Sequence, residues 1–238
     1  VQGERYAGES SSLYLCSRDA AENIQRYNPD SRIIIMLREP VDFLFSLHSQ
    51  YQRETGENVR DFRTALRIEK ERRKGRSIPP RIRAPVLLYY RDRVRYSENV
   101  RRYLERFSPG NVKIIIYEDF KKDNIQAYRE VLRFLGIDNS FVPRLRTVNP
   151  NRTVRYKSLH TFLNNPFLKK LFIMLLPLKI QLRTKRTLDR IFFHDREKKK
   201  NNNELKKRLM REFRPEVRKL SRLLNKDLVR RWGYDRIY

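Results

Sequence analysis

The sequence predicts an α/β domain in which a parallel sheet is flanked by helices, followed by a basic helical part at the C-terminal end. Two short apolar runs rich in β-branched residues, Arg32–Leu37 and Val112–Tyr117, are typical of buried strands. Helical patterns separate and follow these runs, and strands that alternate with helices favour a parallel sheet. A chain of 238 residues can bury a full core, so one domain spanning residues 1–238 is the simplest organisation.

The expected helices follow from apolar periodicity and from the residues at helix ends. In chain order they cover Asp19–Tyr27, Val41–Arg53, Val59–Lys74, Val86–Phe107 and Asn124–Leu135. Gly136 directly follows the last of these, where a glycine commonly ends a helix. The tail from about Phe162 onward is expected to be helical and basic, with an amphipathic helix over Glu204–Leu224 interrupted at Pro215.

The charge balance is strongly positive, with 55 Lys and Arg against 28 Asp and Glu and a net charge of +27. Such a field suits nucleic acid, an anionic membrane surface, or an anionic cofactor together with an anionic acceptor such as a glycan. The single cysteine, Cys16, excludes an internal disulfide framework and a cysteine-based zinc site. The three histidines, His48, His160 and His194, are far apart and lack spaced carboxylate partners, so no metal site is expected.

The longest apolar patch, Leu171–Leu178, is far shorter than the ~20 residues that span a bilayer. It has two interpretations, which the sequence leaves open. One is a buried helix end or a hydrophobic part of a substrate lid. The other is a peripheral membrane contact, because Lys169, Lys170 and Lys179 flank the patch and would meet anionic lipid.

The segment after the first predicted strand combines three features that attract an anion. Arg38 follows the strand at once, and Pro40 stands where a helix would begin, a position at which its missing N–H costs nothing. The start of a helix offers free backbone N–H groups and the positive end of the helix dipole. Ser46 adds a hydroxyl two turns further on.

This segment resembles the 3′-phosphate-binding motif of the sulfotransferases, which use 3′-phosphoadenosine 5′-phosphosulfate (PAPS) as sulfonate donor. The family pattern is an apolar run, an Arg-x-Pro triplet and a serine about eight residues after the arginine. Arg38, Pro40 and Ser46 fit it, with Glu39 at a variable position. The resemblance implies a P-loop-like α/β fold and assigns the 3′-phosphate to Arg38 and Ser46. The alternative is an ordinary strand–helix junction with a solvated arginine.

A second match surrounds the second predicted strand. Tyr117-Glu118-Asp119-Phe120 resembles the family's strand ending, and Phe134–Ile137 resembles the end of its next helix. The resemblance implies that Tyr117 lies against the adenine ring of PAPS. The alternative is that Tyr117 packs in the core. Glu118 and Asp119 are expected to cap the next helix or to hold local arginines rather than to perform chemistry.

A third match concerns a basic loop, which resembles the family only in its position along the chain and in its positive charge. In sulfotransferases a basic loop in this region closes over the cofactor, and here Asn149–Ser158 is basic but lacks the glycines of the better known form. The resemblance makes Arg152, Arg155 and Lys157 candidates for contacts with the 3′-phosphate. A solvated basic loop is the alternative.

Two further residues are candidates for catalysis. Gly8–Leu15 resembles a segment that lines the acceptor cleft in several carbohydrate and bacterial sulfotransferases, but Ser10 stands at the position of the family's lysine. Glu9 is therefore a candidate cleft carboxylate, although a capping role is equally natural. His48, on the helix after Arg38, is the other candidate, and a lone histidine on a helix is more often structural.

The family's donor-phosphate loop, a strand followed by a Lys-x-Gly-Thr-type turn, is expected upstream of residue 1, so we interpret the chain as a piece of a longer protein. The implied reaction is in-line sulfonate transfer to a hydroxyl or amine, with an anionic glycan among the candidate acceptors. Two alternatives remain open: a nucleic-acid- or polyanion-binding protein without catalysis, and a nucleotide kinase of the same architecture. Asn151-Arg152-Thr153 is a glycosylation sequon, and a glycan there would lie in the proposed cofactor loop. An unglycosylated, cytoplasmic protein is therefore favoured, and the Golgi lumen remains open.

Overall fold

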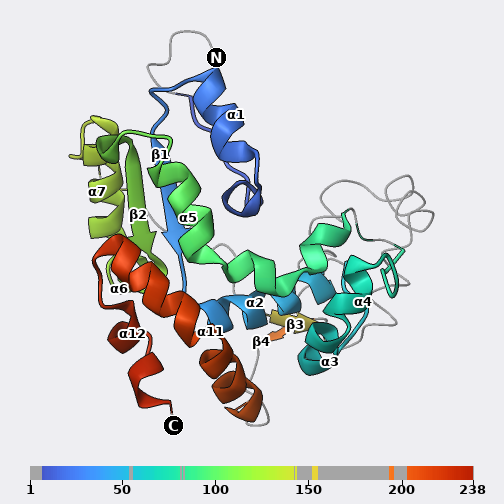
Figure 1. Cartoon of the computed structure of the whole chain (residues 1–238). Coiled ribbons are helices and arrows are strands. Elements are labelled where there is room, and N and C mark those ends of the chain that lie inside the picture. Colours follow the sequence, from blue (N-terminus) through green and yellow to red (C-terminus); the bar gives the residue numbers. More distant parts are fainter. Residues whose placement is uncertain are drawn as a thin grey trace, which may run out of the picture.

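The computed structural model describes residues 7–53, 56–80, 82, 84–141, 143, 152–154, 193–195 and 203–237. At its centre two strands, β1 (Ile33–Leu37) and β2 (Val112–Ile116), pair in parallel with Ile33 opposite Val112 and Leu37 opposite Ile116. Helix α5 (Tyr96–Leu104) packs on β1 and helix α7 (Asn124–Leu135) on β2 (Figure 1). The predicted parallel sheet with flanking helices is therefore present in the described part of the chain.

The remaining elements follow the chain in a regular order. The helices are η1 (Tyr14–Cys16), α1 (Ala20–Tyr27), α2 (Pro40–Arg53), α3 (Phe62–Arg67), α4 (Glu69–Arg73), η2 (Pro85–Leu88), η3 (Tyr90–Val94), η4 (Pro109–Asn111), α6 (Tyr117–Lys122), α11 (Asn203–Leu224), α12 (Leu228–Arg231) and η6 (Tyr234–Arg236). A second, antiparallel pair joins β3 (Arg152–Val154) to β4 (Phe193–Asp195). Among the described residues, no helix is long and apolar enough to cross a membrane.

The C-terminal helix α11 completes the core rather than extending from it. Its apolar residues recur every three or four positions and are buried: Leu205, Leu209, Phe213, Val217 and Leu220. They pack on the buried face of α5, which carries Tyr96, Val100 and Tyr103. Figure 1 shows α11 passing close to the carboxyl ends of both parallel strands. The end of the chain thus helps to enclose the region where β1 and β2 end.

Several predicted elements differ from the structure. The single helix expected over Val86–Phe107 is instead two 3₁₀ segments, η2 and η3, followed by α5. The helix expected over Val59–Lys74 starts only at Phe62, because Asp61 has extended backbone and caps it through the Thr64 amide, and it breaks at Ile68. Pro215 does not interrupt α11, which continues through it.

Three smaller corrections concern the strands and the tail. Tyr117 begins α6 instead of ending the strand. The first strand is not buried throughout, because Ile34 and Met36 are 43% and 46% exposed while Ile35 and Leu37 point inward. Phe193–Asp195, within the tail that was expected to be helical, is the strand β4. The apolar patch Leu171–Leu178 lies outside the described residues.

Candidate functional site

Arg38 and Tyr117 meet because of the register of the two parallel strands. Leu37 pairs with Ile116, so the next residue of each strand emerges at the same edge of the sheet. The Arg38 guanidinium lies 4.9 Å from the centre of the Tyr117 ring, within the range of a cation–π contact. Both side chains are half-buried. Among the described residues, no carboxylate lies within ion-pair distance of Arg38.

The expected free N–H groups at the start of α2 are already occupied, which corrects one part of the sequence interpretation. The Glu39 carboxylate accepts hydrogen bonds from the amides of Val41 (2.9 Å) and Asp42 (2.6 Å). Glu39 therefore caps the helix in the way that serine or aspartate usually does. A ligand anion here would meet the Arg38 side chain rather than these two amides.

Glu39 belongs to a buried network that reaches the last residues of the chain. It is only 5% exposed, and the Tyr234 hydroxyl donates to its Oε1 at 2.5 Å. Burial raises the pKa of Glu39, although hydrogen bonds from Tyr234 and from the two capped amides act in the opposite direction. The same burial raises the pKa of Tyr234 above that of a solvated tyrosine, with the Glu39 charge as a further cause.

Glu118 links the second strand to this network. Its Oε1 accepts the Glu39 amide at 3.2 Å, and its Oε2 accepts the indole N–H of Trp232 at 3.0 Å. Next to it, Asp119 pairs with Arg231. The expectation that Glu118 and Asp119 hold neighbouring groups rather than perform chemistry agrees with these contacts. The arginine is Arg231, more than one hundred residues away.

Ser46 lies on α2 one turn after Asp42, on the side of the helix that continues from Glu39. Its side chain is half-buried and makes no hydrogen bond to any described residue. Asp42 itself pairs with Lys206 of α11 at 2.8 Å. Two polar groups of this region, the Arg38 guanidinium and the Ser46 hydroxyl, are therefore left for a ligand.

The third group of candidates is only partly described. The backbone of Arg152 belongs to β3, which packs next to α2 (Figure 1). This places the start of the basic loop in the same region of the fold as the helix that carries Ser46. Arg155 and Lys157 lie outside the described residues.

The two catalytic candidates have different surroundings. Glu9 is exposed and accepts the Tyr14 hydroxyl at 2.6 and 2.7 Å, which raises the pKa of Tyr14. Among the described residues, Glu9 makes no polar contact with Arg38 or Glu39. His48 is 6% exposed, lies 4.8 Å from the Phe62 ring and has Nε2 2.9 Å from the carbonyl oxygen of Val59. This packing favours a structural role for His48.

Sequence reasoning missed the role of the tail in this site. Glu39 stands at a variable position of the family pattern, and no local feature of the sequence links it to Tyr234. The available signal was that an acidic residue directly precedes Pro40 in the sequence. A side chain that can accept hydrogen bonds, placed immediately before a proline at the first helical position, indicates an N-terminal helix cap. That signal would have identified the cap but not its distant partner.

The comparisons with known proteins agree with this geometry. The model of the Sulfotransferase family matches residues 17–141, which is more than half of the chain and includes both strands and the Arg38 turn. A crystal structure of a sulfotransferase from Alicyclobacillus acidocaldarius matches with a TM-score of 0.64 and 28% identity, over 98% of this chain and 70% of that one. No curated protein matches. The predicted α/β fold of the sulfotransferase type is thereby confirmed, and the chain belongs to the sulfotransferase family.

Proposed function

We propose that the protein transfers a sulfonate group from PAPS to a hydroxyl or amine of its acceptor, and that Arg38 and Ser46 hold the 3′-phosphate of the donor. Membership of the family supports sulfonate transfer in general. The observation that carries the donor assignment is the half-buried Arg38 guanidinium, which rests on the Tyr117 ring and has no carboxylate partner among the described residues. An arginine fork matches the oxygens of a phosphate group.

The residues around Arg38 also fit a donor that is bound in a fixed orientation. The cap by Glu39 fixes the first turn of α2, and the Tyr117 ring restricts the guanidinium to one side. The half-buried Tyr117 ring can also lie beside an adenine ring, as the resemblance implies. Arg152, with Arg155 and Lys157 beyond it, remains a proposed cover for the 3′-phosphate.

Sulfonate transfer requires little covalent chemistry from the protein, because PAPS supplies a sulfonate on a good leaving group. The acceptor oxygen or nitrogen forms the new bond to sulfur while the bond to the departing phosphate breaks, and a base takes the acceptor proton. Of the two candidates for that base we retain Glu9, which is exposed, over His48, which is enclosed in the core.

Titration calorimetry with two nucleotides tests the donor assignment. Adenosine 3′,5′-bisphosphate carries the 3′-phosphate and adenosine 5′-monophosphate does not. The unchanged protein should bind the bisphosphate more tightly, and Arg38→Ala should weaken only the bisphosphate, by about 10- to 100-fold, as expected for a lost charge-assisted hydrogen bond. Arg26→Ala removes an exposed arginine from α1 and is the matched control.

The same titration, extended to ATP, PAPS and a polyanion, separates the alternative functions. Equal losses for both nucleotides, or no loss, would show that Arg38 does not read the 3′-phosphate. A salt-sensitive affinity for any polyanion, without preference for the 3′-phosphate, would support a polyanion-binding protein instead. A preference for ATP over PAPS would support a nucleotide kinase. The five cations along one groove of α11 are the specific observation that favours polyanion binding as an additional property.

A further inference from the structure

Helix α11 has two chemically distinct sides. Its apolar residues are buried against the core, and two of its three carboxylates are engaged there as well. Glu212 pairs with Arg91 at 2.5 Å, and Glu216 accepts the amide of Ser97 at 2.6 Å. Since these carboxylates are used on the inner side, they are not available to neutralise the outer side.

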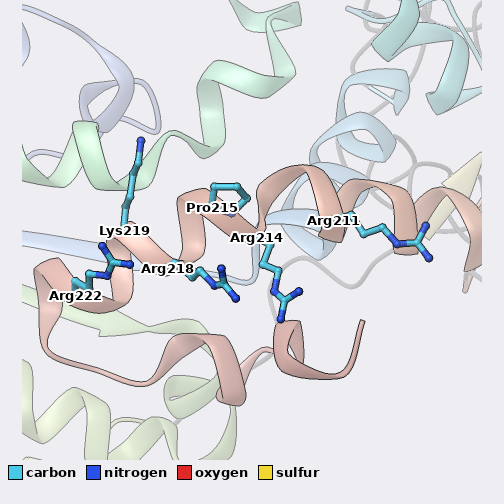
Figure 2. Close-up of a pocket in the computed structure, with 6 residues that line it drawn as sticks. All are labelled: Arg211, Arg214, Pro215, Arg218, Lys219 and Arg222. Carbon is cyan, nitrogen blue, oxygen red and sulfur yellow. The ribbon is translucent and has the colours of Figure 1, made fainter. Parts of the chain in front are cut away.

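The outer side carries a groove lined by arginine and lysine around one proline (Figure 2). The lining residues are Arg211, Arg214, Pro215, Arg218, Lys219 and Arg222. Figure 2 shows Arg214 and Arg218 projecting to one side of the helix and Lys219 to the other. The compact ring of Pro215 stands between these long side chains and leaves the space between them open.

Three of the five cations of this groove are poorly compensated within the described part of the chain. Among the described residues, no carboxylate lies within ion-pair distance of Arg218, Lys219 or Arg222. The Nε of Arg214 is buried without a hydrogen-bond partner in that same part of the chain. Like charges on neighbouring turns repel one another, and a buried donor without an acceptor costs free energy. An anionic ligand would relieve the repulsion between the exposed cations.

The spacing of these residues fits an extended ligand rather than a single ion. Arg214, Arg218 and Arg222 recur every four residues, which places them about 6 Å apart along the helix axis. From Arg211 to Arg222 the row extends about 16 Å. A polymer with repeated anionic groups can contact the row at several points, whereas a single small anion would meet one or two residues.

We propose that the α11 groove binds an anionic polysaccharide bearing sulfate or carboxylate groups. The arginine forks match the oxygens of these groups. The lining contains no aromatic residue on which a nucleic-acid base could stack. It also lacks the exposed apolar side chains with which an amphipathic helix enters a membrane, because the large exposed apolar residues of the described chain all lie outside α11.

The position of α11 connects this groove with the donor site. Lys206, in the first turns of α11, pairs with Asp42 in the first turn of α2. The groove begins at Arg211, about 8 Å further along the helix. Lys206 lies on the inner side of α11 and the groove on the outer side, so a polysaccharide in the groove would reach the Arg38 region only by extending around the helix. The interpretation of this polysaccharide as the acceptor rests on the proposed sulfonate transfer. The binding of the polysaccharide to the groove does not depend on that proposal.

Fluorescence anisotropy with a labelled heparin-derived oligosaccharide tests the binding. Changing Arg218, Lys219 and Arg222 together to glutamine should weaken binding by about tenfold or more and reduce its dependence on salt. The control variant changes Arg101, Arg129 and Arg133 to glutamine, which removes the same charge from exposed positions of α5 and α7 and should leave binding nearly unchanged. If the groove variant fails to fold, Arg218→Gln alone should still weaken binding.

Equal losses in the two variants would overturn the proposal, because net charge alone would then explain the binding. Tighter binding of single-stranded DNA or of phosphatidylserine vesicles, lost only in the groove variant, would replace the polysaccharide by that ligand. Adenosine 3′,5′-bisphosphate should bind the groove variant with unchanged affinity. Failure of the donor assignment would instead appear in the Arg38→Ala titration, so the two proposals fail separately.

Discussion

The hydroxyl of Tyr234 donates a 2.5 Å hydrogen bond to the carboxylate of Glu39, across 195 positions of the sequence. Glu39 in turn caps the helix that begins directly after Arg38. The last turn of the described chain is thus connected, through one buried carboxylate, to the turn that carries the proposed phosphate-binding arginine. Loss of this contact should affect both the stability of the fold and the order of the donor site.

Tyr234→Phe should destabilise the protein by about 1–3 kcal/mol, because Oε1 of the buried Glu39 loses one of its two donors and keeps only the Val41 amide. Urea unfolding measures this change, and Trp232, the only tryptophan of the chain, reports it directly. Trp232 is 7% exposed, so its emission should shift to longer wavelength when the tail detaches. Tyr27→Phe is the control, because Tyr27 is 92% exposed. Equal stability of the two variants would contradict a structural role for the Tyr234 hydroxyl.

Glu39→Gln should have a pH-dependent effect whose sign follows from burial. Since burial raises the pKa of Glu39 in the folded state, the contribution of this group to stability is complete below its unfolded pKa, about 4.3, and declines as the pH rises through the folded value. Glutamine does not ionise. The unchanged protein should therefore lose stability relative to the variant as the pH rises above about 4.3, and urea unfolding at a series of pH values measures this loss. A relative gain with rising pH would contradict this assignment.

The strand–turn–helix unit around Arg38 could be predicted because its signals are local. An apolar β-branched run, a proline at the first helical position and an apolar period are contained within Arg32–Arg53. The Glu39 network could not be predicted in this way, because its partners Tyr234 and Trp232 come from the other end of the chain. Tyr234 and Trp232 reach this network only because α11 packs on α5, and local sequence patterns do not specify that packing.

The long helix expected over Val86–Phe107 shows how tertiary contacts override a helical pattern. Tyr90 is fully buried, and its hydroxyl donates to the carboxylate of Glu57 at 2.8 Å. Two short 3₁₀ segments place the ring and its hydroxyl where these contacts form, and the regular helix begins only at Tyr96. Helix propensity differences of a few tenths of a kcal/mol per residue are smaller than the cost of leaving such a polar pair unsatisfied.

Tyr117 should position Arg38 through the face of its ring. Tyr117→Leu removes the aromatic face and should weaken the binding of adenosine 3′,5′-bisphosphate by about 2- to 30-fold, which corresponds to a cation–π contact of about 0.5–2 kcal/mol. Tyr117→Phe keeps the ring and should retain most of the affinity. Titration calorimetry compares the variants. If Tyr117→Phe lost as much affinity as Tyr117→Leu, the hydroxyl rather than the ring would be the important group.

The buried ion pair between Glu57 and Arg72 should be the most sensitive polar contact of the core. Both side chains are fully enclosed, the pair is bidentate with both distances at 2.7 Å, and Glu57 also accepts from Tyr90. Glu57→Gln removes the charge that compensates Arg72 and should cost about 3–5 kcal/mol. Combining it with Arg72→Met should recover part of that loss, because no unpaired charge then remains buried. An additive loss in the double variant would show that the two residues act independently.

The same pair should dominate the response of the core to acid. Burial opposes the ionisation of Glu57, but hydrogen bonds from Arg72, from the Val59 amide and from Tyr90 outweigh it and lower its pKa. A carboxylate with a lowered folded pKa stabilises the protein above its unfolded pKa of about 4.3, and this contribution is lost as the pH falls through the folded value. The Glu57→Gln variant lacks this ionisation. The difference in unfolding free energy between the two proteins should therefore shrink below about pH 4, and a constant difference from pH 7 to pH 3 would contradict the lowered pKa.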